Sequence, residues 1–128
     1  MKTVIFACVH NAGRSQMAAA FYNALSKDGS RAISAGTQPG TRVHPEVVTV
    51  MREAGLDLSQ AQPQRLTAEL AQSADLLITM GCGDECPVVP GLQRDDWPLA
   101  DPKAKPLDEV RAIRDQIRAR VEALLKTP

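Results

Sequence analysis

The sequence predicts one α/β domain, in which helices cover both faces of a small parallel sheet. Short apolar segments of β type alternate along the chain with segments of helical periodicity, and this alternation is typical of right-handed βαβ crossovers. The chain has 128 residues, of which 44% are hydrophobic and 23% are charged, as in an ordinary single domain. There is no internal repeat or linker, so residues 1–128 are expected to fold as one unit.

Four short segments are expected to be strands. Residues 4–7 form an apolar run that is typical of a strand buried on both faces. Residues 31–35 form a second strand, which Gly36 closes, and residues 76–80 form the clearest central strand. A further short strand is expected at residues 93–96, inside a stretch that Gly and Pro interrupt repeatedly.

The helical segments carry apolar side chains three or four residues apart. A first helix is expected from Ser15 onward. His44 and Pro45 open a second helix, and Gly55 ends it. A third, short helix ends at residues 70–73. The last helix has the clearest periodicity, and its inner side is formed by Val110, Ile113, Ile117, Val121 and Leu124.

Charge and aromatic content exclude several classes of function. Lys plus Arg and Asp plus Glu each total 15, so the formal net charge is zero, and aromatic residues make up 3% of the chain. This composition argues against nucleic-acid binding and against a polybasic membrane sensor, because both depend on positive potential. No apolar run approaches the length of about 18 residues that a membrane span needs.

The start of the chain and its cysteines indicate a compartment. The apolar run of residues 1–9 ends at His10 without a cleavage site, so we interpret it as a first strand and not as a signal peptide. Three cysteines without an export signal predict the reducing cytoplasm, where cysteines serve reactivity or packing. We therefore expect a cytoplasmic monomer.

The candidate site lies directly after the first strand. In parallel sheets, ligands bind beyond the carboxyl ends of the strands. Here a loop with a cysteine and an arginine separated by five residues joins a strand to a helix; its sequence is Cys8-Val9-His10-Asn11-Ala12-Gly13-Arg14-Ser15. Its backbone N–H groups and the helix N-terminus can converge on an oxyanion, and the guanidinium of Arg14 can grip two of the oxygens. This pattern predicts that residues 9–15 bind a tetrahedral oxyanion.

The same surroundings act on Cys8. A helix N-terminus and a nearby cation favour the thiolate form of a cysteine, and the Ser15 hydroxyl could donate a hydrogen bond to the sulfur. Cys8 would then be a nucleophile below the bound oxyanion. The alternative is a buried structural cysteine that happens to precede an arginine.

This loop, followed by Gln16-Met17-Ala18, resembles the active-site loop of the low-molecular-weight tyrosine phosphatase fold, and more closely that of the arsenate reductases built on this fold. The likeness extends over most of the chain, through residues 34–36, 54–59, 75–80, 86–87 and 97–102. The resemblance implies a three-layer α/β fold with a four-stranded parallel sheet. It also implies that Asp101, before Pro102, is the general acid, and we expect Trp97 to pack beneath that segment rather than to form a lid.

Phosphatase and reductase chemistry diverge after the first attack. Reduction of As(V) to As(III) needs two electrons and hence further thiols, which Cys82 and Cys86 can supply. The resemblance implies a relay for arsenic detoxification: Cys8 forms an arsenate adduct, a second cysteine attacks Cys8 and releases arsenite, and the third leaves a Cys82–Cys86 disulfide for thioredoxin to reduce. Phosphate and sulfate would compete with arsenate. No bound cofactor or metal is expected.

Several alternatives remain open at this point. Related enzymes use mycothiol or glutathione with a glutaredoxin-like protein as the reductant, and the order of Cys82 and Cys86 is not fixed by their spacing. A Cys-x3-Cys pair also has zinc-ligand spacing, with His10, His44 or Cys8 as further ligands. The alternative enzyme is a tyrosine phosphatase, although Lys103 replaces the tyrosine of its usual Asp-Pro-Tyr signature. A non-enzymatic oxyanion or metal sensor is the third candidate.

Overall fold

The computed structural model describes residues 2–80, 91–100 and 102–126. Its elements follow the expected alternation. In chain order they are β1 (Thr3–Cys8), α1 (Arg14–Leu25), β2 (Arg31–Gly36), α2 (Pro45–Glu53), α3 (Ala68–Gln72), β3 (Leu76–Thr79), β4 (Gln93–Asp96) and α4 (Leu107–Lys126). The four strands form a parallel sheet in the order β2-β1-β3-β4. The predicted fold class is therefore confirmed.

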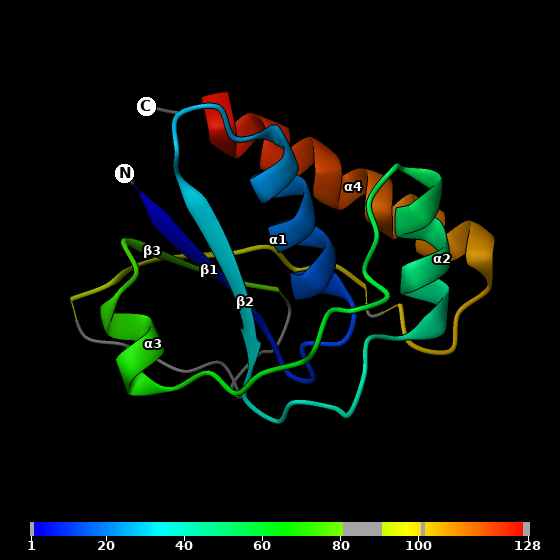
Figure 1. The fold of residues 1–128 in the computed structure, drawn as a ribbon, viewed down its shortest axis with the longest axis horizontal. Coiled ribbons are helices and arrows are strands. Elements are labelled where there is room, and N and C mark those ends of the chain that lie inside the picture. The colour runs from blue at the N-terminus through cyan, green and yellow to red at the C-terminus, as the bar shows by residue number, and fades with distance from the viewer. Residues whose placement is uncertain (1, 81–90, 101, 127–128) are drawn as a thin grey trace.

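Three layers make up the domain (Figure 1). α1, α2 and α4 lie on one face of the sheet, and α3 lies on the other. Alternate residues of β1 divide between the two faces, as the two-residue period of a strand requires. Val4, Phe6 and Cys8 belong to the large core beneath α1 and α4, whereas Ile5 and Ala7 pack in a smaller cluster with Leu66, Leu70 and Ala74. Cys8 thus ends the central strand on the face that carries α1.

The observed boundaries differ little from the expected ones. α1 begins at Arg14, one residue before Ser15, and Gly36 belongs to β2 instead of following it. β3 ends at Thr79, although the amide of Met80 still donates to the carbonyl of Ala7 at 2.9 Å. These shifts of one residue reflect the hydrogen bonds at element ends, which hydrophobic periodicity does not reveal.

Ion pairs join α2 to α4. Arg111 donates from Nε and Nη2 to the two carboxylate oxygens of Glu53, at 2.9 and 2.8 Å. Arg114 adds a contact of 3.1 Å to the same carboxylate. The hydrogen bond from Arg111, more than its charge, lowers the pKa of Glu53 from 4.5 to about 2. This bidentate pair fixes α2, which begins next to the candidate site, against the longest helix.

None of the helices in the described part of the chain is both long enough and apolar enough to cross a membrane.

Candidate active site

The loop between β1 and α1 is held from outside through its carbonyl groups. The carbonyls of Cys8, Val9 and Ala12 accept hydrogen bonds from the amides that follow β2, namely those of Thr37, Gln38 and His44, at 3.3, 2.8 and 2.9 Å. The C=O and N–H groups of a trans peptide unit point in opposite directions. The amide of the residue after each of these carbonyls therefore points to the inner side of the loop.

The inner side of the loop thus gathers N–H groups around one point. Among the described residues, no backbone carbonyl accepts from the amides of residues 9–13. α1 starts immediately afterwards, and its first intrahelical bond runs from the amide of Met17 to the carbonyl of Gly13 at 3.0 Å. The N–H groups of the first turn and the positive end of the helix dipole therefore face the same point. Such an arrangement binds an anion.

Asn11 braces this loop from within. It is fully buried and has a φ of 52°, in the left-handed region that Asn tolerates better than most residues. Its Oδ1 accepts from the backbone amide of Gln64 at 2.9 Å and from the side chain of Gln16 at 3.2 Å. Because a backbone amide can only donate, these contacts fix which end of the Asn11 amide is the oxygen.

Ser15 connects Asn11 to Cys8. The Nδ2 of Asn11 donates to Ser15 Oγ at 2.7 Å, and Ser15 Oγ lies 2.9 Å from Cys8 Sγ. Since Ser15 accepts from Asn11, its own hydroxyl proton can point to the sulfur, where it stabilises a thiolate more than a thiol. The expected Ser15–Cys8 contact is confirmed. Burial of Cys8 fits both the reactive and the structural interpretation, whereas a hydroxyl group that can donate to the sulfur favours the reactive one.

Arg14 lies at the first turn of α1 and is 8% exposed. Its Nη1 donates to the carbonyl of Leu99 at 2.8 Å. Leu99 belongs to the segment that follows β4, 85 residues farther along the chain. This contact orients the plane of a guanidinium that has five N–H donors in a fixed fork. Arg14 therefore links the oxyanion loop to the segment that leads to residue 101.

Two positions, Gly13 in the loop and Gly36 beside it, have no room for a side chain. A Cβ on Gly36 would lie 2.6 Å from the carbonyl oxygen of Val9 and 3.0 Å from the amide nitrogen of Asn11. A Cβ on Gly13 would lie 2.8 Å from Cγ of Pro102. Real Cβ atoms essentially never lie closer than 3.0 Å to such an atom, so a methyl group at either position would force its neighbour to move. The end of β2 and the ring of Pro102 therefore lie directly against the loop.

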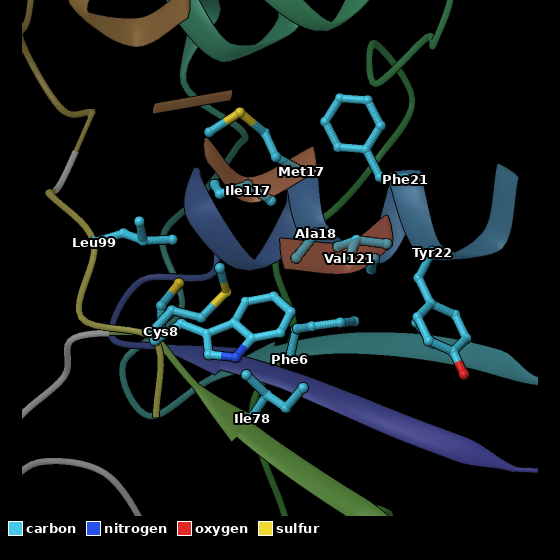
Figure 2. Close-up of a cluster of buried hydrophobic side chains, with 14 of the residues drawn as sticks. Phe6, Cys8, Met17, Ala18, Phe21, Tyr22, Ile78, Leu99, Ile117 and Val121 are labelled. Atoms are coloured by element: carbon cyan, nitrogen blue, oxygen red, sulfur yellow. The ribbon is translucent and has the colours of Figure 1, made fainter. Parts of the chain in front are cut away.

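Three further residues that the sequence analysis considered are His10, His44 and Trp97. His10 is exposed in the loop, and His44 is the residue before α2, as expected. Trp97 is 5% exposed and its ring centroid lies 5.4 Å from that of Phe6, so it packs into the core and the lid interpretation is wrong. Figure 2 shows Cys8 and Leu99 at one end of this core and Tyr22 at the other.

Three predicted catalytic residues, Cys82, Cys86 and Asp101, lie outside the described residues. Within residues 2–80, 91–100 and 102–126, no three His, Cys, Asp or Glu side chains are grouped so that they could hold a metal ion.

Sequence reasoning missed three supporting groups. Gln64 braces Asn11 through its backbone amide, and Gln16 donates from Nε2 to Asn11 and to the carbonyl of Gln62. The carbonyl of Leu99 holds Arg14. Two of these contacts are made by backbone groups far away in the sequence, and such contacts leave no signal in residue type. Gln16 directly follows the loop, and its polar side chain at the buried start of a helix is the sequence signal for its role.

Comparison with known proteins gives the family. Residues 3–127 match the family of low molecular weight phosphotyrosine protein phosphatases. A glutaredoxin arsenate reductase from Synechocystis is 35% identical over 128 residues, which cover 98% of this chain and 97% of that protein.

Solved structures give the same fold. The thioredoxin-dependent arsenate reductase of Corynebacterium glutamicum is 38% identical with a TM-score of 0.83, and the match covers 98% of this chain but only 61% of that one. A low molecular weight protein tyrosine phosphatase from T. tengcongensis is 25% identical with a TM-score of 0.89, over 98% of this chain and 99% of that one. This chain belongs to the low molecular weight phosphotyrosine protein phosphatase family, and its relatives there include arsenate reductases.

Proposed function

We propose that this protein is an arsenate reductase in which Cys8 is the nucleophile. The observation that carries the proposal is the hydroxyl oxygen of Ser15, which lies 2.9 Å from the Cys8 sulfur and can donate to it, within a loop whose amides face inward. Such a loop stabilises both a thiolate and the oxyanion that it attacks. Arsenate reductases at 35% and 38% identity support the assignment of arsenate as the substrate.

The aromatic residues support a small inorganic oxyanion over a phosphotyrosine side chain. The sequence contains one Trp, one Tyr and two Phe, and all of these side chains are buried in the core: Phe6, Phe21, Tyr22 and Trp97. No Phe, Tyr or Trp ring is therefore available to flank the mouth of the site and to stack on a phenyl group. Phosphate and sulfate have the shape and charge to compete with arsenate in the same loop.

In the first step, the Cys8 thiolate attacks arsenic. An S–As bond forms, one As–O bond breaks, and the departing oxygen takes up a proton and leaves as water. Arg14 and the loop amides stabilise the charge that remains on the oxygens. Asp101 is the proton donor that we propose. Its neighbour Pro102 lies against Gly13 of the loop, which supports this role.

In the second step, a second cysteine thiolate attacks the Cys8 sulfur. The S–As bond breaks, its electron pair stays on arsenic, As(V) becomes As(III), and a disulfide to Cys8 remains. The third cysteine then attacks this disulfide and leaves a Cys82–Cys86 disulfide. The position of Met80 supports Cys82 as a partner, because the amide of Met80 donates to Ala7, the residue before Cys8. Cys82 is two residues farther along the chain.

Thioredoxin is the reductant that we propose for the Cys82–Cys86 disulfide. The Corynebacterium relative is named thioredoxin-dependent, whereas the Synechocystis relative is named a glutaredoxin arsenate reductase. Three cysteines in this chain allow an internal relay that ends in a disulfide. This number supports thioredoxin as the reductant, because thioredoxin reduces a disulfide that has already formed within a protein. The reducing cytoplasm is the matching compartment.

The test is mass spectrometry of the reduced protein after it has reacted with arsenate in the absence of any reductant. We expect one arsenite per protein, a mass lower by two hydrogens, and a crosslinked peptide pair that contains Cys82 and Cys86. The variant Cys8→Ser should release no arsenite, and Cys82→Ser and Cys86→Ser should each complete at most one turnover. Full multiple turnover by Cys86→Ser with thioredoxin as the only reductant would contradict the relay.

The same experiment distinguishes arsenate reduction from the second candidate function, which is hydrolysis of phosphate esters. The phosphatase relative with a TM-score of 0.89 shows that this fold also serves phosphate ester hydrolysis. If arsenate leaves all three thiols reduced while an aryl phosphate is hydrolysed with a phosphorylated Cys8 intermediate, the protein is a phosphatase and the reductase proposal fails. Addition of thioredoxin or of glutathione with glutaredoxin, in separate reactions, identifies the reductant.

A further inference from the structure

We propose that Gln16 is a positioning residue of the oxyanion loop, and that its side-chain amide directs the N–H group of Ala12 towards the oxyanion. Gln16 lies in the first turn of α1, directly after the loop, and is 6% exposed. It acts through Asn11. Its role rests on the proposed function, in which residues 9–15 bind the oxyanion that Cys8 attacks.

The outer contacts of the loop carbonyls are the first observation. Four of the five carbonyls of residues 8–12 accept hydrogen bonds from backbone amides in the segment that follows β2. These amides, at 3.3, 2.8, 2.9 and 2.9 Å, belong to Thr37, Gln38, Gly40 and His44. The remaining carbonyl, that of Asn11, accepts from Nε2 of Gln16 at 3.1 Å. The Gln16 side chain therefore supplies the fifth outer donor.

This contact sets the direction of the Ala12 amide. The carbonyl of Asn11 and the N–H of Ala12 belong to one trans peptide unit, in which the two groups point in opposite directions. Since the carbonyl faces outward to Gln16, the N–H faces the inner side of the loop. Asn11 has a φ of 52°, which side chains disfavour. The peptide unit therefore depends on an outside contact to keep this direction.

Two further contacts fix the Gln16 amide itself. Its Nε2 also donates to Oδ1 of Asn11 at 3.2 Å and to the carbonyl of Gln62 at 3.3 Å. Two of the three acceptors are backbone carbonyls, which cannot donate, so the nitrogen end of this amide is unambiguous. One nitrogen thus joins the first turn of α1, the loop and the segment before α3. Asn11 is fully buried, where a carbonyl without a partner would be costly.

Gln16 also acts on the nucleophile. Because it donates to Oδ1 of Asn11, it favours the orientation in which Nδ2 of Asn11 donates to Ser15 Oγ, at 2.7 Å. Ser15 Oγ lies 2.9 Å from Cys8 Sγ and can donate to it. Loss of the Gln16 amide should therefore weaken oxyanion binding and also make Cys8 less reactive.

Asn23 offers a matched control on the same helix. Its Nδ2 donates to the carbonyl of Ala32 at 3.1 Å, and its Oδ1 accepts from the amide of Ala32 at 2.8 Å. Ala32 lies near the start of β2, whereas the loop lies against the other end, at Gly36. Gln16→Met and Asn23→Leu each replace an amide by an apolar side chain of similar size without a change of charge.

The experiment measures the affinity for inorganic phosphate from protection of Cys8 against iodoacetamide, with the Cys8 peptide quantified by mass spectrometry. We expect Gln16→Met to weaken phosphate binding by about 10-fold, because the oxyanion loses one charge-assisted hydrogen bond. Asn23→Leu should bind phosphate as the wild type does, although the urea unfolding midpoints of both variants should fall. Without phosphate, Gln16→Met should slow the alkylation of Cys8, and this effect should be absent in a Ser15→Ala background.

Wild-type phosphate affinity in Gln16→Met would overturn the proposal. An equal loss of affinity in Asn23→Leu would do the same, because lowered stability would then be the cause. Equal slowing of alkylation with and without the Ser15 hydroxyl would refute the action through Asn11.

If Gln16→Met does not fold, Gln16→Asn replaces it. Its amide is one methylene shorter and cannot reach all three oxygens, so reduced phosphate affinity supports the proposal and wild-type affinity overturns it. None of these measurements needs turnover of arsenate. A wild-type protein that does not reduce arsenate would refute the proposed function, and phosphate binding would still decide on the role of Gln16.

Discussion

The hydroxyl oxygen of Ser15 lies 2.9 Å from the sulfur of Cys8. This contact joins the end of the central strand to the first turn of α1. Ser15 also accepts from Nδ2 of Asn11, whose Oδ1 accepts from the backbone of Gln64. A chain of hydrogen bonds therefore runs from the segment before α3 to the nucleophile, and the Ser15 hydroxyl proton can point to the sulfur.

Loss of the Ser15 hydroxyl should make Cys8 less reactive. A hydrogen bond to a charged group contributes about 1.5–3 kcal/mol, so Ser15→Ala should slow the alkylation of Cys8 by iodoacetamide, by at most about 10- to 100-fold. This rate is measured in a Cys82→Ser, Cys86→Ser background, where Cys8 is the remaining thiol. Ser59→Ala, at an exposed position, is the control. Equal alkylation rates in the Ser15 and Ser59 variants would refute the thiolate role of Ser15.

Replacement of Arg14 by lysine should weaken oxyanion binding although the charge is kept. Lysine is a point charge and cannot reproduce the planar fork that engages two oxygens. The loss of one charge-assisted hydrogen bond predicts roughly a 10-fold or greater fall in phosphate affinity. Phosphate protection of Cys8 against alkylation provides the measurement, and Arg52→Lys, on exposed α2 surface, is the control. Unchanged protection in Arg14→Lys would contradict the bidentate contact.

A methyl group at Gly36 should disrupt the loop. It would lie 2.6 Å from the Val9 carbonyl oxygen and 3.0 Å from two Asn11 atoms, one of them the amide nitrogen. Backbone atoms cannot yield cheaply, so Gly36→Ala should lower the free energy of unfolding by about 1–3 kcal/mol and also reduce phosphate protection. Urea unfolding checks the first effect. Gly40→Ala, whose methyl group has room, should change neither quantity, and a stable Gly36→Ala variant with full protection would show that the loop does not depend on this contact.

The attachment of α2 to α4 should depend on pH. Arg111 lowers the pKa of Glu53 from 4.5 to about 2 in the folded protein. A carboxylate with a lowered pKa stabilises the fold fully above pH 4.5, and this contribution is lost as the pH falls towards about 2. The difference in unfolding free energy between wild type and Glu53→Gln should therefore be constant above pH 4.5 and shrink below it. Added salt should reduce it, because the pair is partly exposed. A difference that grows on acidification would exclude this ion pair as its source.

The fold was largely predictable because its elements are encoded locally. The apolar run of β1 and the periodic residues of α4 have the burial that their patterns predict: Val4 and Ile117 are completely buried. Right-handed crossovers then leave few arrangements for alternating strands and helices. The order β2-β1-β3-β4 was not contained in these patterns. It depends on which strands pair, and pairing is a property of the folded chain.

The candidate site, like the fold, was predictable from the sequence only in part. The sequence by itself determined that Cys8, Arg14 and Ser15 share one short loop between a strand and a helix, because covalent spacing limits how far apart they can lie. Only the tertiary structure decided that Gln64 braces Asn11, that Leu99 holds Arg14 and that Pro102 needs a glycine at position 13. The physical reason is that these contacts join backbone and ring atoms distant along the chain. Their meeting depends on the packing of the whole domain and not on the local identity of either residue.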